Sequence, residues 1–555
     1  MNLPCLRCAT ILFLTHAFIL FKGENAVSQS FPPIEITIHD TAETEGYYFL
    51  APYASSPPYS YTHPQLILDR LGEVVWYRIF SGLPATTTTY DFKIQPDGRM
   101  TYYSIARKKY FVMDSTFMVK DSLDAANGFE LDVHDLQFLP DGHYLLLALE
   151  TRIMNLTGYH YFGINHILPG SANAQVVGVV IQEFDENKTL VWEWKGHDHF
   201  AFNDVDSLFL FNSNKVDWTH ANAVEQDDDG NILLSCRHFN EITKINRQTG
   251  DIIWRLGGKR NQFTSPNDSL NFSGQHDIRR ISNGHITILN NGTNNVPPLA
   301  RALEFALDET LKTATRVWGY SYNTSVYSIA VGSHQVLSNG NHLVDFGTIP
   351  EGYPWLVLVK PDTSVAMEIS YAGSYTSYRA FNYESLPWEL PRPLVACYHS
   401  GNDFFLEAEP GHPQYLWSTG ATTQSIPITD TGEYWVFVPY GKGFVSSRHI
   451  VVSDIFNPCL YLPDKEPAEQ RSMSVSCVPN PARDQIRILF DLPARSEISI
   501  DILDLAGRAR ITIPGVVFLP GKNQIPVDIS QLIKGIYFLR FFAGQSVITE
   551  KIIVE

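Results

Sequence analysis

The sequence is short of cysteine, of positive charge and of long hydrophobic runs. Its 555 residues include only six cysteines, which excludes a small scaffold held together by disulfides. The 41 lysines and arginines face 59 acidic residues, so the formal net charge is −18. This balance argues against nucleic acid as a partner and against a polybasic membrane anchor, because both need a basic surface. Hydrophobic residues make up 44% and charged residues 18%, which excludes a wholly disordered chain.

The one long apolar stretch lies near the N-terminus, where Arg7 precedes the run Ala9–Phe21. Small residues at Ala26 and Ser28 then fit a signal-peptidase site, so residues 1–28 are predicted to be a cleaved signal peptide. A membrane-anchoring helix is the alternative, but the run is shorter than the roughly 20 residues that span a bilayer. We therefore expect an exported mature chain without a transmembrane span.

Aromatic residues, glycine and proline are abundant, and they favour short strands and turns over long helices. Between Leu66 and Tyr371 one pattern recurs: an apolar strand, a glycine turn, a second apolar strand and a later strand that often ends near tryptophan. An Asp-Gly or Asn-Gly pair between apolar runs is a strong hairpin signal. The turns fall at Gly98, Gly142, Gly230, Gly284 and Gly340, and the later strands at Val74–Trp76, Leu190–Trp192, Ile252–Trp254 and Arg316–Trp318.

These repeats predict an all-β chain whose largest part is a six-bladed β-propeller within residues 29–390. The units centre on residues 40–85, 88–124, 132–196, 216–258, 274–321 and 328–372. Spacings of about 40–60 residues between four-stranded units are typical of a propeller. The third unit is long because it carries an insertion near residues 151–173, which is expected to form a loop on one rim.

Two smaller modules follow. Residues 393–456 alternate apolar residues with short turns and predict a small immunoglobulin-like β-sandwich, and residues 457–474 form a polar linker. The last region, 475–555, contains in order Pro479–Arg483, Ile500–Arg508, Gly535–Phe538 and Lys551–Glu555. It resembles the C-terminal sorting domain of type IX secretion substrates. The resemblance implies a β-sandwich that engages the type IX secretion machinery, export across the outer membrane, and release or attachment at the cell surface.

Three repeats begin their first strand with a histidine. His134 and His276 each stand eight residues before a turn glycine, and His220 stands ten residues before one. The two extra residues preserve the strand parity. Because equivalent positions in a propeller are related by rotation about its axis, the three side chains are expected to converge at one channel mouth. Structural caps between blades are the alternative, but three histidines in register favour a site.

Two polar residues of the fourth unit extend this cluster. Arg237 ends the strand Ile232–Cys236 and suits bidentate binding of an oxyanion, and Asn222 points to the same face as His220. An anionic substrate is therefore expected. Three histidines could also bind zinc, but short metal-binding spacings are absent around them and Arg237 would oppose a cation. No P-loop or dinucleotide fingerprint is present, so neither a metal nor an organic cofactor is expected.

Five ordered motifs then carry a resemblance. They are Asp217-Trp-Thr-His-Ala-Asn-Ala-Val224, Asn231-Ile-Leu-Leu-Ser-Cys-Arg237, Thr249-Gly-Asp-Ile-Ile-Trp-Arg-Leu-Gly-Gly258, Gly274-Gln-His-Asp277 and Arg301-Ala-Leu-Glu304. Together they resemble the arylsulfate sulfotransferase family, over most of residues 40–372. The resemblance implies a six-bladed propeller that moves a sulfuryl group from a phenolic sulfate donor to a phenolic acceptor. It also implies a ping-pong mechanism without a nucleotide donor, in which a histidine is transiently sulfated.

Matched by motif, His276 is the expected nucleophile. His220 and Asn222 match the family's His-x-Asn pair, Arg237 matches its sulfate-binding arginine, and His134 matches its remaining site histidine. His134 or His220 would protonate the leaving phenolate and later deprotonate the acceptor, and the sequence leaves that choice open. In the sixth unit, Ser333 or His334 would fill the equivalent substrate-binding position.

The chain departs from the family at its cysteines and leaves two other functions open. Members with a defined mechanism have a close cysteine pair near the site, whereas only Cys236 stands there in this chain. Cys397 and Cys459 are candidates for a disulfide elsewhere. One alternative function is a non-catalytic secreted propeller that binds a glycan or a protein. The other is a quinoprotein dehydrogenase, whose repeats resemble Thr249–Trp254 but which needs a metal-binding carboxylate set not seen here.

Overall fold

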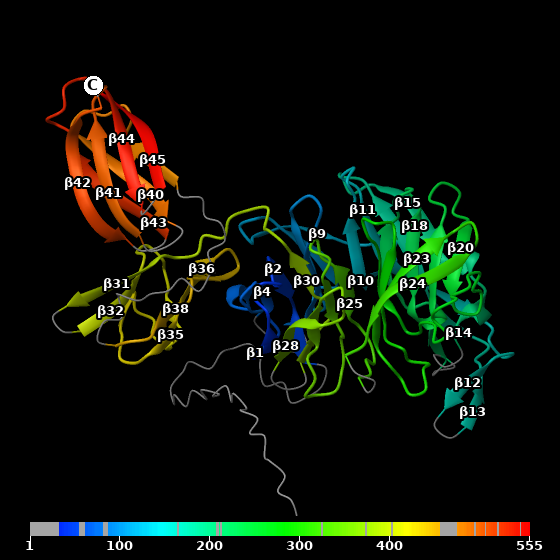
Figure 1. Cartoon of the computed structure of the whole chain (residues 1–555). Coiled ribbons are helices and arrows are strands. Elements are labelled where there is room, and N and C mark those ends of the chain that lie inside the picture. Colours follow the sequence, from blue (N-terminus) through cyan, green and yellow to red (C-terminus); the bar gives the residue numbers. More distant parts are fainter. Residues whose placement is uncertain are drawn as a thin grey trace, which may run out of the picture. The chain divides into compact units, whose positions relative to one another are not determined.

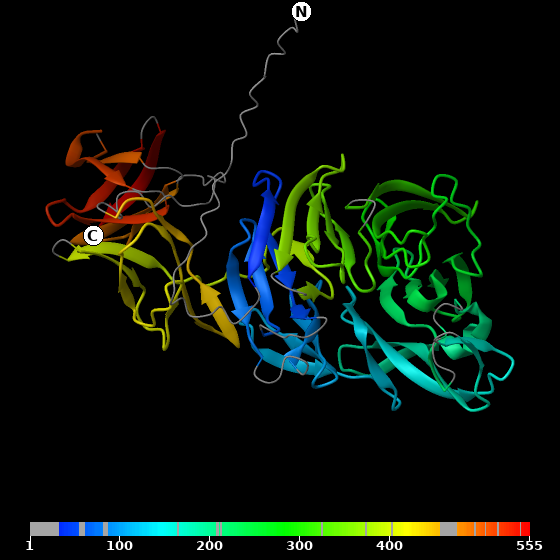
Figure 2. The ribbon, with the colours of Figure 1, turned by 90° about the horizontal axis from the view of Figure 1, so that it is seen from below.

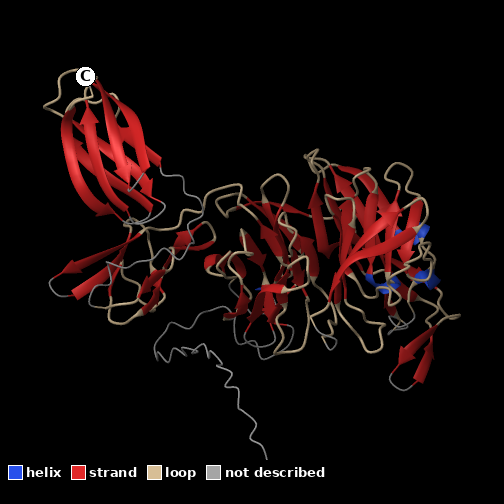
Figure 3. Cartoon of the chain, viewed as in Figure 1, coloured by secondary structure: helices blue, strands red, loops and turns tan. Residues whose placement is uncertain are grey.

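The computed structural model describes residues 33–54, 62–80, 87–163, 166–206, 210, 214–322, 326–371, 375–400, 403–455, 474–492, 496–505, 507–518, 521–543 and 546–555. The predicted signal peptide and residues 457–473 of the predicted linker lie outside these ranges. Strands dominate the regular structure and the few helices are short (Figure 3). No helix among the described residues is long and apolar enough to cross a membrane.

The chain divides into two compact units. The first comprises the described residues up to Tyr398 together with Phe405–Pro427 and Trp435–Arg448. The second comprises His399–Phe404, Ile428–Tyr434 and the described residues from His449 to Glu555. All seven site residues expected from the sequence belong to the first unit.

Four sheets of the first unit each contain four strands that follow one another along the chain and pair antiparallel (Figures 1 and 2). Their strands are β6 (Thr89–Ile94), β7 (Met100–Ser104), β8 (Lys109–Met113) and β9 (Val119–Leu123); β10 (Glu130–Phe138), β11 (Tyr144–Met154), β14 (Ala174–Phe184) and β15 (Leu190–Lys195); β17 (Ala221–Gln226), β18 (Ile232–Cys236), β19 (Glu241–Ile245) and β20 (Ile252–Gly257); and β21 (His276–Arg280), β22 (Ile286–Asn290), β23 (Arg301–Asp308) and β24 (Thr313–Tyr320). These strands match the second to fifth predicted units.

The insertion in the third unit is not a simple loop. It lengthens β11 and β14, which pair along their full length to Met154 and Ala174, and it adds a separate pair of strands, β12 (His160–Gly163) and β13 (His166–Pro169). A short strand, β16 (Lys215–Asp217), then pairs parallel to β14 and leads the chain toward His220. The short helices α2 (Gly196–His199) and η1 (Phe202–Asp204) lie between β15 and β16.

Two further sheets combine segments from both ends of the repeat region. The sixth unit forms β25 (Ser333–Val336), β26 (His342–Asp345), β27 (Leu356–Val359) and β28 (Val365–Tyr371), and β1 (Ile34–His39) adds to its outer edge. The first predicted repeat supplies β2 (Tyr47–Leu50), β4 (Gln65–Asp69) and β5 (Val74–Arg78) to one sheet. Another strand of this sheet, β30 (Phe381–Tyr383), comes from beyond the sixth predicted repeat. A small pair, β3 (Pro52–Ala54) and β29 (Tyr375–Ser377), adds a further link between these ends.

In each of the six sheets one edge strand, called the first strand here, is hydrogen-bonded to the first strand of the next sheet. The sixth of these links leads back to β6, so the series is closed. The bonds join Lys93 to Asp135, Val224 to Asp135, Asn222 to the carbonyl of Gln275, His334 to Asp277, Gln335 to Asn382, and Tyr383 to the backbone of Ile94. The linked strands are β6, β10, β17, β21, β25 and β30. Groups that sit near the start of these strands are therefore held close together.

A local irregularity recurs in four of these first strands. The pairing register shifts between Tyr90 and Lys93, between Leu131 and Leu136, between Ala221 and Ala223, and between His276 and Arg279. Such bulges re-aim side chains relative to the regular alternation of a strand. As a result the histidine and the aspartate of a His-Asp pair both find polar partners instead of one facing an apolar core.

The region predicted as an immunoglobulin-like sandwich is partly joined to the first sheet. Its strand β37 (Gly443–Ser446) pairs with β5, and β36 (Val436–Tyr440) and β33 (Leu416–Trp417) continue the same seven-stranded sheet. The other strands form smaller sheets of β31 (Val395–Ser400), β32 (Asp403–Ala408) and β34 (Ser425–Pro427), and of β35 (Gly432–Tyr434) and β38 (Ile450–Val452). Cys397 is disulfide-bonded, while Cys459 lies outside the described residues.

The C-terminal region has two sheets that share one apolar core, in agreement with the predicted β-sandwich. One sheet contains β39 (Ser474–Val478), β40 (Gln485–Leu492) and β43 (Gly521–Asp528); the other contains β41 (Ser496–Leu503), β42 (Ala509–Phe518), β44 (Gly535–Ala543) and β45 (Ser546–Val554). Ile488 and Phe490 of the first sheet belong to the same buried cluster as Ile500, Leu539 and Phe541 of the second.

Candidate functional site

The three histidines of the repeat register lie together in the structure. The ring centroids of His134 and His220 are 5.0 Å apart in an edge-to-face arrangement. His276 opens β21, and burial, followed by the charge of Arg237, lowers its pKa. The cluster thus gathers side chains from three neighbouring sheets, at the ends where β10, β17 and β21 come closest to one another.

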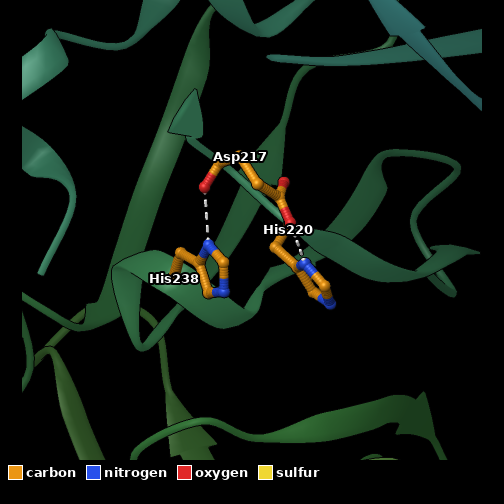
Figure 4. Close-up of side chains that lie close together, drawn as sticks. All are labelled: Asp217, His220 and His238. Carbon is orange, nitrogen blue, oxygen red and sulfur yellow. Dashed lines mark hydrogen bonds and ion pairs between the residues drawn. The ribbon is translucent and has the colours of Figure 1, made fainter. Parts of the chain in front are cut away.

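Two of these histidines are paired with carboxylates through Nδ1. His220 Nδ1 lies 2.5 Å from Asp217 Oδ2, and His134 Nδ1 bonds Asp132 Oδ1 (Figure 4 shows the Asp217 pair). Burial lowers the pKa of His134, but the charge and the hydrogen bond of Asp132 outweigh it and raise the pKa above its ordinary value. Nε2 of each ring is left on the far side from its carboxylate, where it can exchange a proton with a ligand.

A fourth histidine, His238, belongs to the cluster and was missed in the sequence. Its ring stacks on His220 with centroids 4.5 Å apart, and Nδ1 donates to the backbone oxygen of Asp217 at 2.6 Å (Figure 4). Burial lowers the pKa of His238 to about 3, so the ring is neutral. Arg237 Nη1 donates to its Nε2 at 3.0 Å, and Nη2 donates to the carbonyl of Ile329 at 3.0 Å. His238 therefore orients the guanidinium on the short helix η3 (Arg237–Phe239).

His276 has a different set of partners from the other histidines. Only 2% of its surface is exposed, and Nδ1 lies 2.6 Å from Asn291 Oδ1. The backbone N–H of Val331 donates to Nε2 at 3.3 Å. Burial, reinforced by the charge of Arg237, holds the pKa of His276 well below its ordinary value. The ring is therefore neutral, with a lone pair on Nε2.

Asn222 lies within the cluster, but its NH₂ group already donates to a backbone carbonyl and is not free to donate to a ligand. Its Nδ2 donates to the carbonyl of Gln275 at 2.7 Å, while Oδ1 is buried and accepts no hydrogen bond from the described residues. The atom that remains is an acceptor, which matches a hydroxyl proton better than a sulfate oxygen. Asn222 also ties β17 to the residue before His276.

Ser333 and His334 have structural partners in the sixth sheet. Ser333 Oγ donates to the carbonyl of Ala380 at 3.2 Å, beside the last inner strand. His334 Nε2 lies 3.0 Å from His342 Nδ1, its ring stacks on Trp318, and burial lowers its pKa to about 4. The sixth sheet instead reaches the cluster through the backbone of Ile329 and Val331.

A buried set of ion pairs underlies the histidines, and it too was missed in the sequence. Arg379, only 1% exposed, bonds Asp91 and Asp135 through Nη1, pairs with Asp277 through Nε, and donates to the carbonyl of Asn222. Lys93 and Arg279 complete the set by pairing with Asp135. Asp135 and Asp277 directly follow His134 and His276 in the sequence, so each pair sends one side chain to the cluster and one to the ion pairs.

One group of side chains could in principle hold a metal ion: the potential ligand atoms of Asp217, His220 and His238 lie within 4.8 Å of one another (Figure 4). His238 has no lone pair to give, because Nδ1 donates to a carbonyl and Nε2 accepts from Arg237. The adjacent guanidinium also repels a cation. The chemistry of this set favours an anion over a metal ion.

A cavity of about 300 Å³ opens beside the turn that carries Arg237 and His238. Its wall combines the apolar side chains of Phe239, Leu270 and Phe272 with asparagine amides, among them Asn240 and Asn294. Asp206, also in the wall, donates through its backbone N–H to the His238 carbonyl at 2.8 Å. An aromatic ring with polar substituents would match such a mixed wall.

Searches against solved structures find distant likenesses. A protein of unknown function from Bacteroides caccae is 12% identical with a TM-score of 0.36, and the match covers 61% of this chain and 98% of that one. Virginiamycin B lyase from Staphylococcus aureus is 10% identical with a TM-score of 0.30, covering 69% and 93%. PorZ, a surface component of the type-IX secretion system of Porphyromonas gingivalis, is 11% identical with a TM-score of 0.18, covering 89% and 90%. At these TM-scores the likenesses establish nothing about function.

No curated protein matches the chain. Two family models do match, and both agree with the sequence motifs. The model described as Arylsulfotransferase (ASST) covers residues 39–379, and that described as Secretion system C-terminal sorting domain covers residues 476–555. The first match spans more than half of the chain and includes every residue of the histidine cluster. The chain therefore belongs to the arylsulfotransferase family and carries a type IX sorting domain at its C-terminal end.

Proposed function

We propose that this protein transfers a sulfuryl group from a phenolic sulfate ester to a phenolic acceptor, in two steps through a sulfated His276. The arylsulfotransferase match supports aryl sulfotransferase activity in general. The observation that carries the finer proposal is the state of His276: a neutral ring, with its Nδ1 proton held by Asn291, beside Arg237 and two carboxylate-paired histidines. A neutral imidazole can attack sulfur without a separate strong base.

In the first step His276 Nε2 attacks sulfur and the bond from sulfur to the phenolic oxygen breaks. The half-buried guanidinium of Arg237 holds the sulfonate oxygens, on which charge accumulates, in place of its contact with the Ile329 carbonyl. The organic part of the donor occupies the cavity beside Phe239 and Phe272. No step needs a nucleotide, because the donor already carries the sulfuryl group on a phenolic leaving group.

His134 moves the proton in both steps. Asp132 raises its pKa, which increases the fraction of protonated ring near neutral pH and suits it to protonate the leaving phenolate. The ring is then neutral and takes the proton of the incoming phenol as the phenol attacks the sulfated histidine. His220, paired with Asp217 and stacked on His238, supports the cluster from the other side.

The six sheets act as the blades of one propeller. The closed series of hydrogen bonds among β6, β10, β17, β21, β25 and β30 supports this architecture. In a propeller, β30 and β1 would close the ring by completing the first and sixth blades with strands from the opposite end of the repeat region. The sorting domain directs this catalytic part to the outside of the cell, where phenolic sulfates would be met directly.

The kinetic test uses 4-nitrophenyl sulfate as donor, with and without a phenol acceptor. We expect 4-nitrophenol release that depends on the acceptor, and parallel double-reciprocal lines when both substrates are varied. His276→Asn should lower the rate at least about a thousandfold, as removal of a covalent nucleophile does. His285→Asn is the matched control, since this histidine pairs with Glu304 in a hairpin outside the cluster, and it should keep the wild-type rate.

Two outcomes would contradict the proposal. Release that proceeds equally without an acceptor would make the protein a sulfatase. No release from any aryl sulfate would favour a propeller that binds a glycan or a protein without catalysis.

A further inference from the structure

Three histidines occupy similar places in the cluster, but the partner of Nδ1 differs among them. His134 and His220 bond carboxylates, whereas His276 bonds the amide of Asn291. A carboxylate can accept a proton and balance a positive ring, while a neutral amide oxygen can do neither. This difference separates the two carboxylate-paired histidines from the proposed nucleophile.

The orientation of the Asn291 amide is fixed by its other contacts. One terminal atom lies 2.7 Å from Ser328 Oγ and 3.1 Å from the backbone oxygen of Val331. A backbone carbonyl only accepts, so this atom is the NH₂ group and the opposite atom, facing His276, is the oxygen. Nδ1 of His276 must therefore carry the proton, which leaves Nε2 unprotonated.

The backbone of one residue, Val331, contacts both His276 and Asn291. The N–H of Val331 donates to His276 Nε2, and the C=O of Val331 accepts from Asn291 Nδ2. Val331 has φ +59°, a left-handed conformation that is strained for a β-branched residue. Hydrogen bonds on either side hold the backbone in this conformation: Thr348 N–H donates to the Ala330 carbonyl, and Gly332 N–H donates to the Tyr378 carbonyl.

We infer that Asn291 is a positioning residue that selects the Nδ1–H form of His276 and keeps the sulfated intermediate short-lived. The inference rests on the proposed function. When the Nε2–S bond forms and the S–O bond breaks, the phenolate oxygen takes the departing electron pair and a proton from His134. The ring keeps its Nδ1 proton and becomes positively charged, a state in which imidazole is a good leaving group.

The neutral amide of Asn291 does not compensate the positive charge of the sulfated His276 ring, so transfer of the sulfuryl group to the phenol stays fast. A carboxylate at the same place would stabilise the positive ring or remove its proton, and either change strengthens the hold of the ring on sulfur. The choice of asparagine over aspartate at this position would then set how long the sulfated enzyme persists. Val331 N–H, released from Nε2 when sulfur binds there, is placed to donate to a sulfonate oxygen.

The test compares the full-length wild-type protein with Asn291→Asp, Asn291→Ala and, as a matched control, Asn339→Asp. Asn339 is an exposed turn residue whose side-chain oxygen accepts the Asn341 N–H, which an aspartate can also do. Each protein is mixed with 4-nitrophenyl sulfate, then with phenol, and the sulfated His276 peptide is followed by quenched-flow mass spectrometry. The tautomer is read independently from ¹⁵N chemical shifts in histidine-labelled protein without substrate.

We expect Asn291→Asp to lengthen the life of the sulfated peptide after phenol addition by about tenfold or more, because each additional stabilisation of the positive ring by about 1.4 kcal/mol slows its loss tenfold. Asn291→Ala should slow formation of the sulfated peptide and weaken the Nδ1–H signature, because only the Val331 N–H then favours that form. Asn339→Asp should match the wild type.

The inference is overturned if both Asn291 variants keep the wild-type rates and tautomer. It is also overturned if both half-reactions slow equally while the Nδ1–H signature of Asn291→Ala keeps its full strength, because that pattern belongs to a merely structural residue. An unchanged Asn291→Ala tautomer refutes it even if Asn291→Asp fails to fold. Wild-type protein that never forms the sulfated peptide would instead refute the proposed function.

Discussion

At the scale of single residues, the chemistry of the cluster depends on what each imidazole touches. Asp132 and Asp217 bond Nδ1 of His134 and His220, a backbone carbonyl and Arg237 bond the two ring nitrogens of His238, and the amide of Asn291 bonds Nδ1 of His276. Burial lowers the pKa of His238 and of His276, which have no carboxylate on the ring, whereas Asp132 outweighs burial at His134 and raises its pKa.

The pH dependence of the two half-reactions should run in opposite directions. For a donor with a basic leaving phenolate, kcat/KM should fall as pH rises through the raised pKa of His134, because only the protonated ring can donate. For the acceptor, kcat/KM should rise through the same pKa, because the neutral ring must accept. Asp132→Asn removes the charge that raises this pKa, so both transitions should move to lower pH by about one unit.

Measured pH–rate profiles of both half-reactions check this directly. Glu304→Gln is the matched control, since it alters the carboxylate paired with His285 outside the cluster and should leave both profiles in place. Unshifted profiles in Asp132→Asn would show that another group carries the proton.

The sequence reveals which histidines meet, but it does not reveal how they differ. The spacing of His134, His220 and His276 from the turn glycines is a pattern along the chain, and it transfers to space through the repeats. The link between His276 and Asn291 depends on a bulge, on the strained Val331 backbone and on a neighbouring sheet. No local pattern encodes such a contact. The same holds for His238, whose only sequence signal is its place beside Arg237.

At the scale of elements, the bulged first strands explain why His-Asp pairs recur. A regular strand would turn one of the two neighbours toward an apolar core, whereas the shifted register lets the histidine join the cluster while the aspartate pairs with Arg379. Asp135 illustrates the balance: burial raises its pKa, but Arg279, Arg379 and Lys93 hold it well below the ordinary value. Arg379 thus holds four first strands in the arrangement that the cluster needs.

Arg379→Met should destabilise the first unit strongly. It leaves the buried carboxylates of Asp91, Asp135 and Asp277 short of a cation, and breaking a buried ion pair costs about 3–5 kcal/mol. The free energy of unfolding from urea denaturation measures the effect. Arg99→Met, which removes an exposed pair with Asp97, should change it by less than about 1 kcal/mol. Equal effects of the two substitutions would contradict the role given to Arg379.

The predicted hairpins explain most of the elements, and strand exchange explains the exceptions. Gly142 and Gly284 turn with φ of 89° and 82°, as a tight turn between paired strands requires, and the first two strands of each repeat follow from such turns. The strand β30 carries no such signal: its three residues, Phe381–Tyr383, join the first sheet only because the chain returns there. Pairing between residues so far apart in sequence follows from closure of the whole unit.

At the scale of the whole molecule, sequence motifs and family matches agree on a chain with two tasks. The arylsulfotransferase match over residues 39–379 contains the candidate site, and the sorting domain over 476–555 supports secretion or display at the cell surface. The net charge of −18 belongs to the whole chain, whereas Arg237 places a positive charge beside His276. The region between the two matches is less independent than predicted, since β37 pairs with β5.

Peptide mapping after a single turnover shows whether the sulfuryl group is carried by His276. The protein is mixed with 4-nitrophenyl sulfate alone, quenched and digested, and the peptides are searched for an added SO₃ group. We expect this group on His276, and its loss when phenol is added before the quench. Turnover of donor and acceptor with the group on another residue, or with no labelled peptide at all, would contradict it.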